Sequence, residues 1–247
     1  MPEADATLRF CTGILEAVAP YAAAVKLQAA FFERLGPAGM GIYGDLILAS
    51  EELALPVIAD VKRGDIGPVA TAYAEAHLGV YGAACVTVNP YMGEDCVLPF
   101  LEEARAQGRG GGVFVLVATS NPSSGDLQQS TDPPLFELAA GLVAKLGRSN
   151  GDYPDAGAVV GVTRPETGAR VRGLLPDALF LSPGYGAQGG DAAGVRSLLD
   201  RHGRGVLVNS SRSILYAYET STADYKTAAR EAARRTREEL RRIGAHV

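Results

Sequence analysis

The sequence lacks three features that would place the protein at a membrane, outside the cell or on nucleic acid. No apolar run approaches the length that crosses a bilayer, and the first ten residues, MPEADATLRF, are neither basic nor apolar enough for a secretion signal. A basic excess is also missing, because the net charge is −5. We therefore expect a cytoplasmic protein that is neither a membrane protein nor a general nucleic-acid binder.

Cysteine and histidine are scarce, and their spacing argues against a metal site. The three cysteines, Cys11, Cys85 and Cys96, form no ligand pattern, so reduced and packed thiols are expected. The three histidines are scattered, and His77 falls in a predicted helix where a surface position is expected. There is also no serine–histidine–acid set and no nucleotide-triphosphate loop.

The chain does contain enough apolar residues for a sizeable core. It has 247 residues, 47% of them hydrophobic, which suits one domain spanning residues 1–247. Seven short segments are rich in apolar, β-branched residues, a pattern typical of parallel strands that are covered on both faces. These predicted strands are residues 22–27, 56–60, 84–89, 112–118, 158–162, 178–182 and 205–209.

Predicted helices alternate with these strands, which indicates an α/β fold. No Gly-x-Gly-x-x-Gly turn opens an early helix, and this disfavours a dinucleotide-binding sheet. Unusual residues instead follow several different strands, as they do in barrel enzymes. We therefore predict a (β/α)8 TIM barrel that lacks its first β-strand in this chain. The predicted helices are residues 7–18, 70–79, 96–108, 133–147, 192–203 and 224–244.

The segment IADVKRGDIG, residues 58–67, places several charged side chains at the end of a buried strand. Alternation along a strand predicts that Asp60 and Lys62 share a face, and Gly64 permits a bend that brings Asp65 back toward them. A lysine held among carboxylates stays charged, so it suits the role of an acid better than that of a Schiff-base nucleophile. A purely structural ion-pair network is the alternative.

Polar loops follow the last two predicted strands, where barrel enzymes often bind phosphate. In residues 182–190, SPGYGAQGG, glycines around Gln188 allow backbone N–H groups to approach a ligand closely. Arg212 follows the last strand, at a position where a helix would begin, and arginine is a strong phosphate ligand there. Together these two loops predict a phosphate site.

Two further positions are ambiguous from the residues alone. The loop VATSNPSSGDLQ, residues 117–128, offers Thr119 and Ser120 to a heterocycle, although a capped turn explains them nearly as well. Lys26 is a lone charge inside a predicted strand. Its side chain either extends to the rim of the barrel or points into the site.

Five segments in this order, DVKRGDIG, VTVNPYMGED, VATSNP, PGYGAQGG and LVNSSRSILYAY, resemble orotidine 5′-phosphate decarboxylase. The form of the first segment resembles that of the bacterial subgroup with a Lys-Arg-Gly-Asp motif, and the resemblance runs from about Val25 to about Tyr218. It implies a (β/α)8 barrel, a homodimer, and neither a metal nor an organic cofactor. It also implies the conversion of orotidylate, a nucleotide monophosphate, to uridylate and CO2 in pyrimidine synthesis.

The resemblance implies residue roles as well. Asp60 and Lys62 would belong to a charged array beside the substrate carboxylate, with Lys62 protonating C6 as CO2 leaves. Asp65 would reach into the site of the neighbouring subunit, with Ile66 beside it. The remaining substrate contacts are expected at Lys26 near the ribose, Ser120 facing the pyrimidine, Pro183 and Gly189 in the loop after the sixth predicted strand, and Gln188 and Arg212 at the phosphate.

The sequence departs from the family at two places. The family's first strand carries a Gly-Ile/Leu-Asp stretch whose aspartate contacts the ribose, whereas residues 1–10 resemble the segment after that strand. Either the start codon is placed late or the protein works without the strand. In addition, Val69 stands where many relatives have threonine, and Thr71 lies two residues further on. Both departures would affect catalytic efficiency more than substrate class.

Two alternative functions stay open. One is a diverged relative that acts on another nucleotide or sugar 5′-phosphate, which metal dependence would favour. The other is a nucleotide-binding homologue that has lost turnover. The intact set of Asp60, Lys62 and Asp65 argues against the second.

Overall fold

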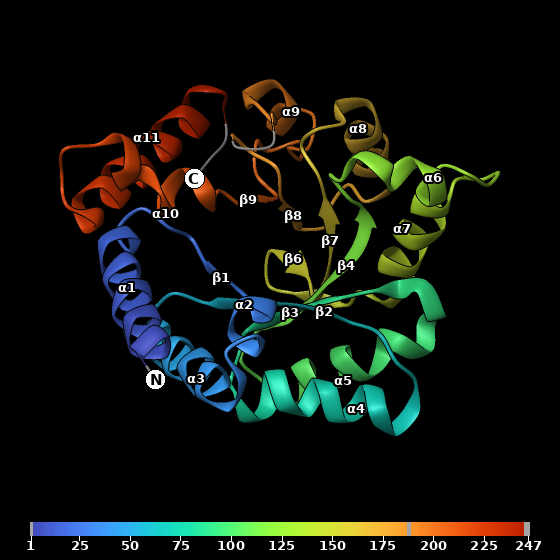
Figure 1. The fold of residues 1–247 in the computed structure, drawn as a ribbon. Coiled ribbons are helices and arrows are strands. Elements are labelled where there is room, and N and C mark those ends of the chain that lie inside the picture. The colour runs from blue at the N-terminus through green and yellow to red at the C-terminus, as the bar shows by residue number, and fades with distance from the viewer. Residues whose placement is uncertain (1, 187–188, 245–247) are drawn as a thin grey trace.

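The computed structural model describes residues 2–186 and 189–244, and it consists of central strands inside a ring of helices (Figure 1). The seven predicted strands are confirmed, and they form one parallel sheet in chain order. Because all neighbours are parallel, the carboxyl ends of the strands meet at one rim. The strands are β1 (Val25–Gln28), β2 (Val57–Arg63), β3 (Cys85–Val88), β4 (Gly112–Ala118), β7 (Ala156–Val160), β8 (Phe180–Ser182) and β9 (Val206–Val208).

Helices cover the outer face of the curled sheet (Figure 1). The longer ones are α1 (Pro2–Val18), α3 (Gly36–Glu52), α4 (Gly67–Ala74), α5 (Leu98–Gln107), α7 (Leu135–Leu146), α8 (Pro165–Leu174) and α11 (Tyr225–Arg242). Shorter elements are α2 (Ala29–Glu33), the π-helix η1 (Glu75–Val80), α6 (Gly125–Gln128), α9 (Ala192–Arg196), α10 (Arg212–Leu215) and the two-stranded β5 (Ser149–Asn150) and β6 (Tyr153–Pro154). No helix among the described residues is both long and apolar enough to cross a membrane.

The predicted helix over residues 192–203 is wrong in length, because α9 ends at Arg196. A side chain beyond it explains the turn that follows. Asp200 Oδ1 accepts hydrogen bonds from the backbone N–H groups of His202 and Arg204, at 2.8 and 2.9 Å. Such bonds offer the backbone an alternative to the helical ladder.

The sequence pattern does not predict α3, and it also misplaces His77. The first half of α3, GPAGMGIYG, is rich in glycine, which has a low helix propensity, but burial of residues such as Tyr43 and Leu46 stabilises the helix.

His77 is buried rather than at the surface, and its Nδ1 lies 3.2 Å from the Tyr43 hydroxyl. Burial lowers the pKa of His77 to about 4, so the ring packs in its neutral form.

The core has two layers, and the inner one determines where the site can lie. Ile58, Phe114, Val159 and Leu181, from four different strands, pack together inside the barrel. The larger apolar cluster fills the space between the strands and the helices. Because side chains alternate along a strand, Asp60 follows Ile58 on the inward face, and it lies toward the carboxyl-end rim.

The two edges of the sheet, β1 and β9, are not paired with each other, and no strand bridges them within the described residues. A cavity of about 240 Å³ lies between these edges. Helices α1 and α11 pack against one another next to the gap (Figure 1), with the Phe10 ring stacked on that of Tyr225 at 5.2 Å. The barrel therefore has seven of the eight strand positions filled by described residues.

At the end of the barrel opposite the carboxyl-end rim, the buried Arg172 forms hydrogen bonds to the connections that lead into β8 and β9. The Arg172 guanidinium lies over the Phe180 ring, 3.6 Å from its centroid, and burial lowers its pKa to about 10, so it remains charged at neutral pH. Its N–H groups donate at 2.7 to 2.9 Å to the carbonyl oxygens of Leu175, Ala178, Leu198 and Gly205.

We expect Arg172→Lys to lower the free energy of unfolding by about 3 kcal/mol, because hydrogen bonds to a charged group contribute on the order of 1.5–3 kcal/mol each and a single ammonium cannot reach four carbonyls. Urea denaturation measures this loss. Arg201→Lys is the matched control, since Arg201 is exposed and its contact with Asp177, at 3.6 Å, is a surface pair. Equal stability of the two variants would contradict the assigned role of Arg172.

Candidate active site

A cavity of about 450 Å³ opens at the carboxyl-end rim of the strands. Its lining combines polar side chains near the ends of β1, β2, β3 and β9, and in the loop after β4, with apolar ones from β4, β7 and β8. This mixture is typical of a small-molecule site. The residues predicted from the sequence that line the cavity are Lys26, Asp60, Lys62, Thr119, Ser120 and Pro183.

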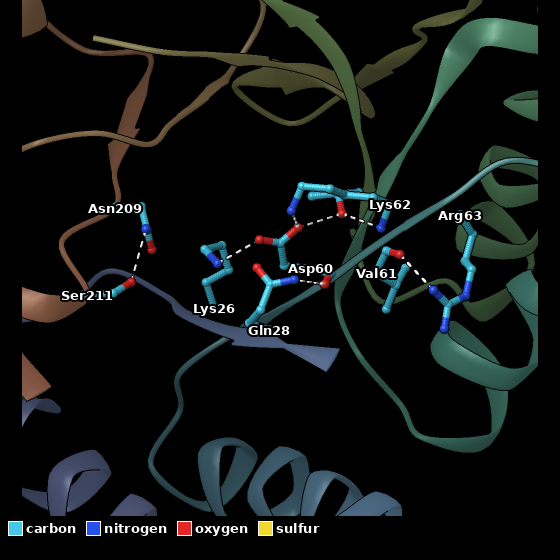
Figure 2. A network of polar contacts seen from close by, with 9 residues as sticks. Lys26, Gln28, Asp60, Val61, Lys62, Arg63, Asn209 and Ser211 are labelled. Atoms are coloured by element: carbon cyan, nitrogen blue, oxygen red, sulfur yellow. Dashed lines mark hydrogen bonds and ion pairs between the residues drawn. The ribbon is translucent and has the colours of Figure 1, made fainter. Parts of the chain in front are cut away.

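Asp60 is the centre of the polar lining, and it is only 5% exposed. Lys26 donates from Nζ to Asp60 Oδ2 at 2.7 Å, and Lys62 Nζ forms a hydrogen bond and ion pair with Oδ1. Figure 2 shows both lysines pointing toward Asp60, whereas Arg63 points away. Of the two orientations considered for Lys26, the structure therefore has the one that points into the site.

The two lysines keep this buried carboxyl ionised. Burial alone would raise the pKa of Asp60, but the charge of Lys26 and the hydrogen bonds from Lys26 and Lys62 outweigh burial and lower the pKa below its ordinary value. Lys62 is the more accessible cation, because 45% of its side chain is exposed against 12% for Lys26. The arrangement thus presents a fixed negative charge beside an exposed ammonium group that can donate a proton.

Lys62 reaches the carboxylate through an irregularity in β2 rather than by regular alternation. Ala59 pairs with Val86 and Arg63 pairs with Val88, so four steps along β2 face two steps along β3. Lys62 lies within this bulge at φ 47°, in the left-handed region that non-glycine residues rarely adopt. The side chains of Asp60 and Lys62 are in contact, as expected. The regular alternation of side chains along β2, from which we predicted this contact, is interrupted by the bulge.

Two residues that the sequence analysis missed support Asp60. Gln28 donates from Nε2 to the Asp60 carbonyl oxygen at 3.0 Å, and the Thr87 hydroxyl donates to Asp60 Oδ1 at 2.9 Å. Both line the cavity. Gln28 lies two positions after Lys26 on the same strand, and this spacing was the only signal for it. Nothing in the sequence singles out Thr87, an ordinary strand residue.

The loop after β4 is held by its own polar side chains. Gln128 accepts from the backbone N–H of Thr119 at 3.0 Å and donates to its hydroxyl at 2.7 Å, while Thr119 donates to Asn121 Oδ1 at 2.6 Å. Thr119 thus has the structural role that the capped-turn reading allows. The adjacent Ser120 approaches the backbone of Gly161 so closely that a Cβ there would lie 2.8 Å from the Ser120 Cβ.

The loops after β8 and β9 lie at the same rim. Pro183 lines the cavity, and Gly189, at φ 86°, donates from its backbone N–H to the Gly186 carbonyl oxygen at 2.9 Å. Gln188 lies outside the described residues. Arg212 is the first residue of α10, as the sequence predicted for a helix start. Asn209 and Ser211, joined by a 3.2 Å hydrogen bond, also line the cavity and lie on the far side of Lys26 from Asp60 (Figure 2).

Asp65 does not join the array within this chain. Its carboxylate accepts a hydrogen bond from the Ile66 N–H at 2.9 Å, and no ion pair to Asp65 occurs among the described residues. The expected bend at Gly64 is instead a close approach, because a Cβ on Gly64 would lie 2.8 Å from the Asn89 carbonyl oxygen. Ile66 is 52% exposed, so this loop faces outward.

No group of three or more histidine, cysteine, aspartate or glutamate side chains that could hold a metal ion occurs in the described part of the chain.

Comparisons with known proteins agree on one family. The model of the orotidine 5′-phosphate decarboxylase / HUMPS family matches residues 5–227. An orotidine 5′-phosphate decarboxylase of Rhodopirellula baltica is 46% identical over 228 residues, covering 87% of this chain and 75% of that protein. Another, from Deinococcus radiodurans, is 44% identical over 229 residues, covering 92% and 82%. The structure of Leishmania donovani OMP decarboxylase superposes with a TM-score of 0.83 at 34% identity, covering 99% of this chain and 90% of that one.

The lowered pKa of Asp60 makes a prediction about acid stability. Because its folded pKa lies below its unfolded one, the ionised carboxylate stabilises the fold above the unfolded value, about 3.9, and this contribution is lost as the pH falls through the folded value. Asp60→Asn removes the titrating group. We therefore expect the difference in unfolding free energy between the wild type and Asp60→Asn to narrow in acid.

Urea denaturation over a range of acid pH values measures this difference. Asp45→Asn is the control, since Asp45 is exposed on α3 and forms no ion pair in the described part of the chain. The plot of unfolding free energy against pH for Asp45→Asn should run parallel to that of the wild type. If the plot for Asp60→Asn also ran parallel to that of the wild type, the fold would not stabilise the ionised Asp60 carboxylate as its contacts indicate.

Proposed function

The chain belongs to the orotidine 5′-phosphate decarboxylase / HUMPS family, and we propose that it acts in it as an orotidine 5′-phosphate decarboxylase. It converts orotidylate to uridylate and CO2 without a metal or organic cofactor. The observation that carries this proposal is the Lys26–Asp60–Lys62 array at the edge of a cavity large enough for a nucleotide monophosphate. We further propose that it belongs to the bacterial subgroup with a Lys-Arg-Gly-Asp motif, which residues 62–65 support, and that it acts in the cytoplasm.

The array provides charge where the reaction changes charge. The substrate carboxylate would lie near Asp60, whose own negative charge is held by two lysines and cannot move away. Loss of CO2 breaks the bond between C6 and the carboxylate carbon and leaves the electron pair on C6. The exposed ammonium of Lys62 stabilises this developing charge and donates its proton to C6, which yields uridylate. Lys62 then regains a proton from water.

Binding at a distance from C6 orients the substrate. Ser120 lies in a loop fixed by the Thr119–Gln128 pair, and we assign it to the pyrimidine. Lys26 is assigned to the ribose side of the array. The phosphate is assigned to the loop that contains Pro183, Gln188 and Gly189 and to Arg212 at the start of α10, because barrel enzymes commonly bind phosphate in these loops. Phosphate binding there contributes to transition-state stabilisation although the phosphate does not react.

We further propose that the enzyme is a homodimer in which Asp65 completes the partner's site. The Asp65 carboxylate forms no ion pair among the described residues, and exposed apolar side chains lie in its loop and in the helix that follows. The loops after β2 and β3 lie side by side, since Asn89 N–H donates to the Arg63 carbonyl oxygen at 2.8 Å. The large exposed apolar residues of these two loops and of α4 are Ile66, Val69, Tyr73, Tyr91 and Met92. A patch of this kind on a soluble surface is typical of an interface.

Loss of ultraviolet absorbance of orotidylate, measured on the purified chain with and without a chelator, tests the activity. We expect turnover by the wild type that a chelator does not reduce. In Lys62→Ala, turnover should fall by at least about 10³-fold while uridylate still binds, because the proton donor acts in the transition state. Lys145→Ala is the control, since Lys145 is exposed on α7. Chelator-sensitive turnover of a sugar phosphate, or uridylate binding without turnover, would instead support one of the two alternatives.

Hybrid dimers test the position of Asp65. Lys62→Ala and Asp65→Ala chains should each be inactive alone, because each dimer site then lacks one member of the array. Mixing them should restore up to about a quarter of wild-type activity, since random exchange makes half of the dimers hybrid and each hybrid holds one site with both groups intact. Subunit exchange is verified by mass spectrometry. Proven exchange without recovery would place Asp65 outside the partner's site.

A further inference from the structure

Thr87, in the middle of β3, lies where β2 bulges. It is 1% exposed, and its hydroxyl has two partners on the neighbouring strand. The oxygen accepts a hydrogen bond from the Lys62 backbone N–H at 2.9 Å, and the hydroxyl donates to Asp60 Oδ1 at 2.9 Å. One side chain therefore holds both the backbone of the proposed acid and the carboxylate that its ammonium contacts.

We propose that Thr87 is a positioning residue that fixes the direction of the Lys62 side chain. It does so by holding the β2 bulge in its left-handed conformation and by fixing the orientation of the Asp60 carboxylate. This inference rests on the proposed decarboxylase function, and it adds to that function a residue on a different strand that does not itself react.

The backbone of the bulge explains why a hydroxyl is needed. The ladder between β2 and β3 is interrupted between Ala59 and Arg63, and the Lys62 N–H donates to a side chain instead of a β3 carbonyl. A partly buried N–H without an acceptor is costly, and a lysine at φ 47° is strained in addition. The Thr87 oxygen supplies the acceptor, and without it the bulge would gain by relaxing to a regular conformation.

The carboxylate explains why the hydroxyl must also donate. Asp60 Oδ2 is bound by Lys26 and Oδ1 by both Lys62 and Thr87, so the carboxylate plane is fixed from three directions. The neighbouring cavity residues on β4 and β7 are Leu116 and Val159, which offer neither a donor nor an acceptor in their side chains. Among these interior strand positions, Thr87 is the one that can take both roles.

Two substitutions separate positioning from packing. Thr87→Val keeps the size and β-branching of the side chain but removes the hydroxyl, and Thr87→Ser keeps the hydroxyl but loses a methyl group. Ser50→Ala is the matched control for loss of a buried hydroxyl, because the Ser50 hydroxyl donates to the Leu46 carbonyl oxygen within α3. Each variant is measured for kcat, for uridylate Kd and for Tm, and Thr87→Val is crystallised.

We expect kcat of Thr87→Val to fall on the order of 10²-fold, because a catalytic group displaced by about 1 Å can cost that much. Uridylate Kd should change much less, Thr87→Ser should recover most of the lost kcat, and Ser50→Ala should change Tm alone. In the crystal structure of Thr87→Val, Lys62 should leave the left-handed region. A purely structural role would lower Tm in Thr87→Val without lowering kcat.

Unchanged kcat in Thr87→Val, or a Thr87→Ser variant as slow as Thr87→Val, would overturn the proposal. The wild type is assayed on orotidylate beside the variants, so that failure of the proposed function is recognised separately. If the wild type did not turn over orotidylate, the crystal structure would still decide the positioning claim. Lys62 remaining near φ 47° in Thr87→Val would refute it, and Lys62 moving to a regular strand conformation would support it.

Discussion

The rest of the site depends on one buried carboxylate that is shared by two lysines. Asp60 lies inside the barrel and carries a charge there only because Lys26 and Lys62 bind its two oxygens. A buried ion pair of this kind contributes little net stability, since desolvation of the charges offsets much of their attraction. The main effect of this arrangement is therefore to fix positions. The Asp60 carboxylate cannot move, and it holds the Lys62 ammonium group beside it.

The fold places Asp60 in this position because the interior of the barrel has two regions, an apolar layer and a polar rim. The inner apolar layer of Ile58, Phe114, Val159 and Leu181 packs inside the barrel below the array. The polar residues begin one alternation further along β2, at the rim where all the parallel strands end. Arg172 stabilises the opposite ends of β8 and β9, so the loops with the assigned phosphate contacts start from fixed strands.

The sequence predicts the strands and several site residues well, because both produce local patterns. Continuous apolar, β-branched runs mark all seven strands, and Lys26, Asp60, Lys62, Ser120 and Pro183 prove to line one cavity. Features that depend on tertiary contacts escape the sequence. The glycine-rich half of α3 is helical through burial, and His77 is buried against a tyrosine from that helix. The β2 bulge and the roles of Gln28 and Thr87 arise from pairing between strands, which no single segment encodes.

The most direct test of this account is a crystal structure of the chain with uridylate bound. The account predicts the pyrimidine ring in the 450 Å³ cavity, with C6 within about 3.5 Å of Lys62 Nζ, a distance suited to proton transfer, and the phosphate in the loops after β8 and β9. A ring bound elsewhere, or a C6 that faces away from Lys62, would contradict the claim that the shared carboxylate aims the lysine at the reacting carbon.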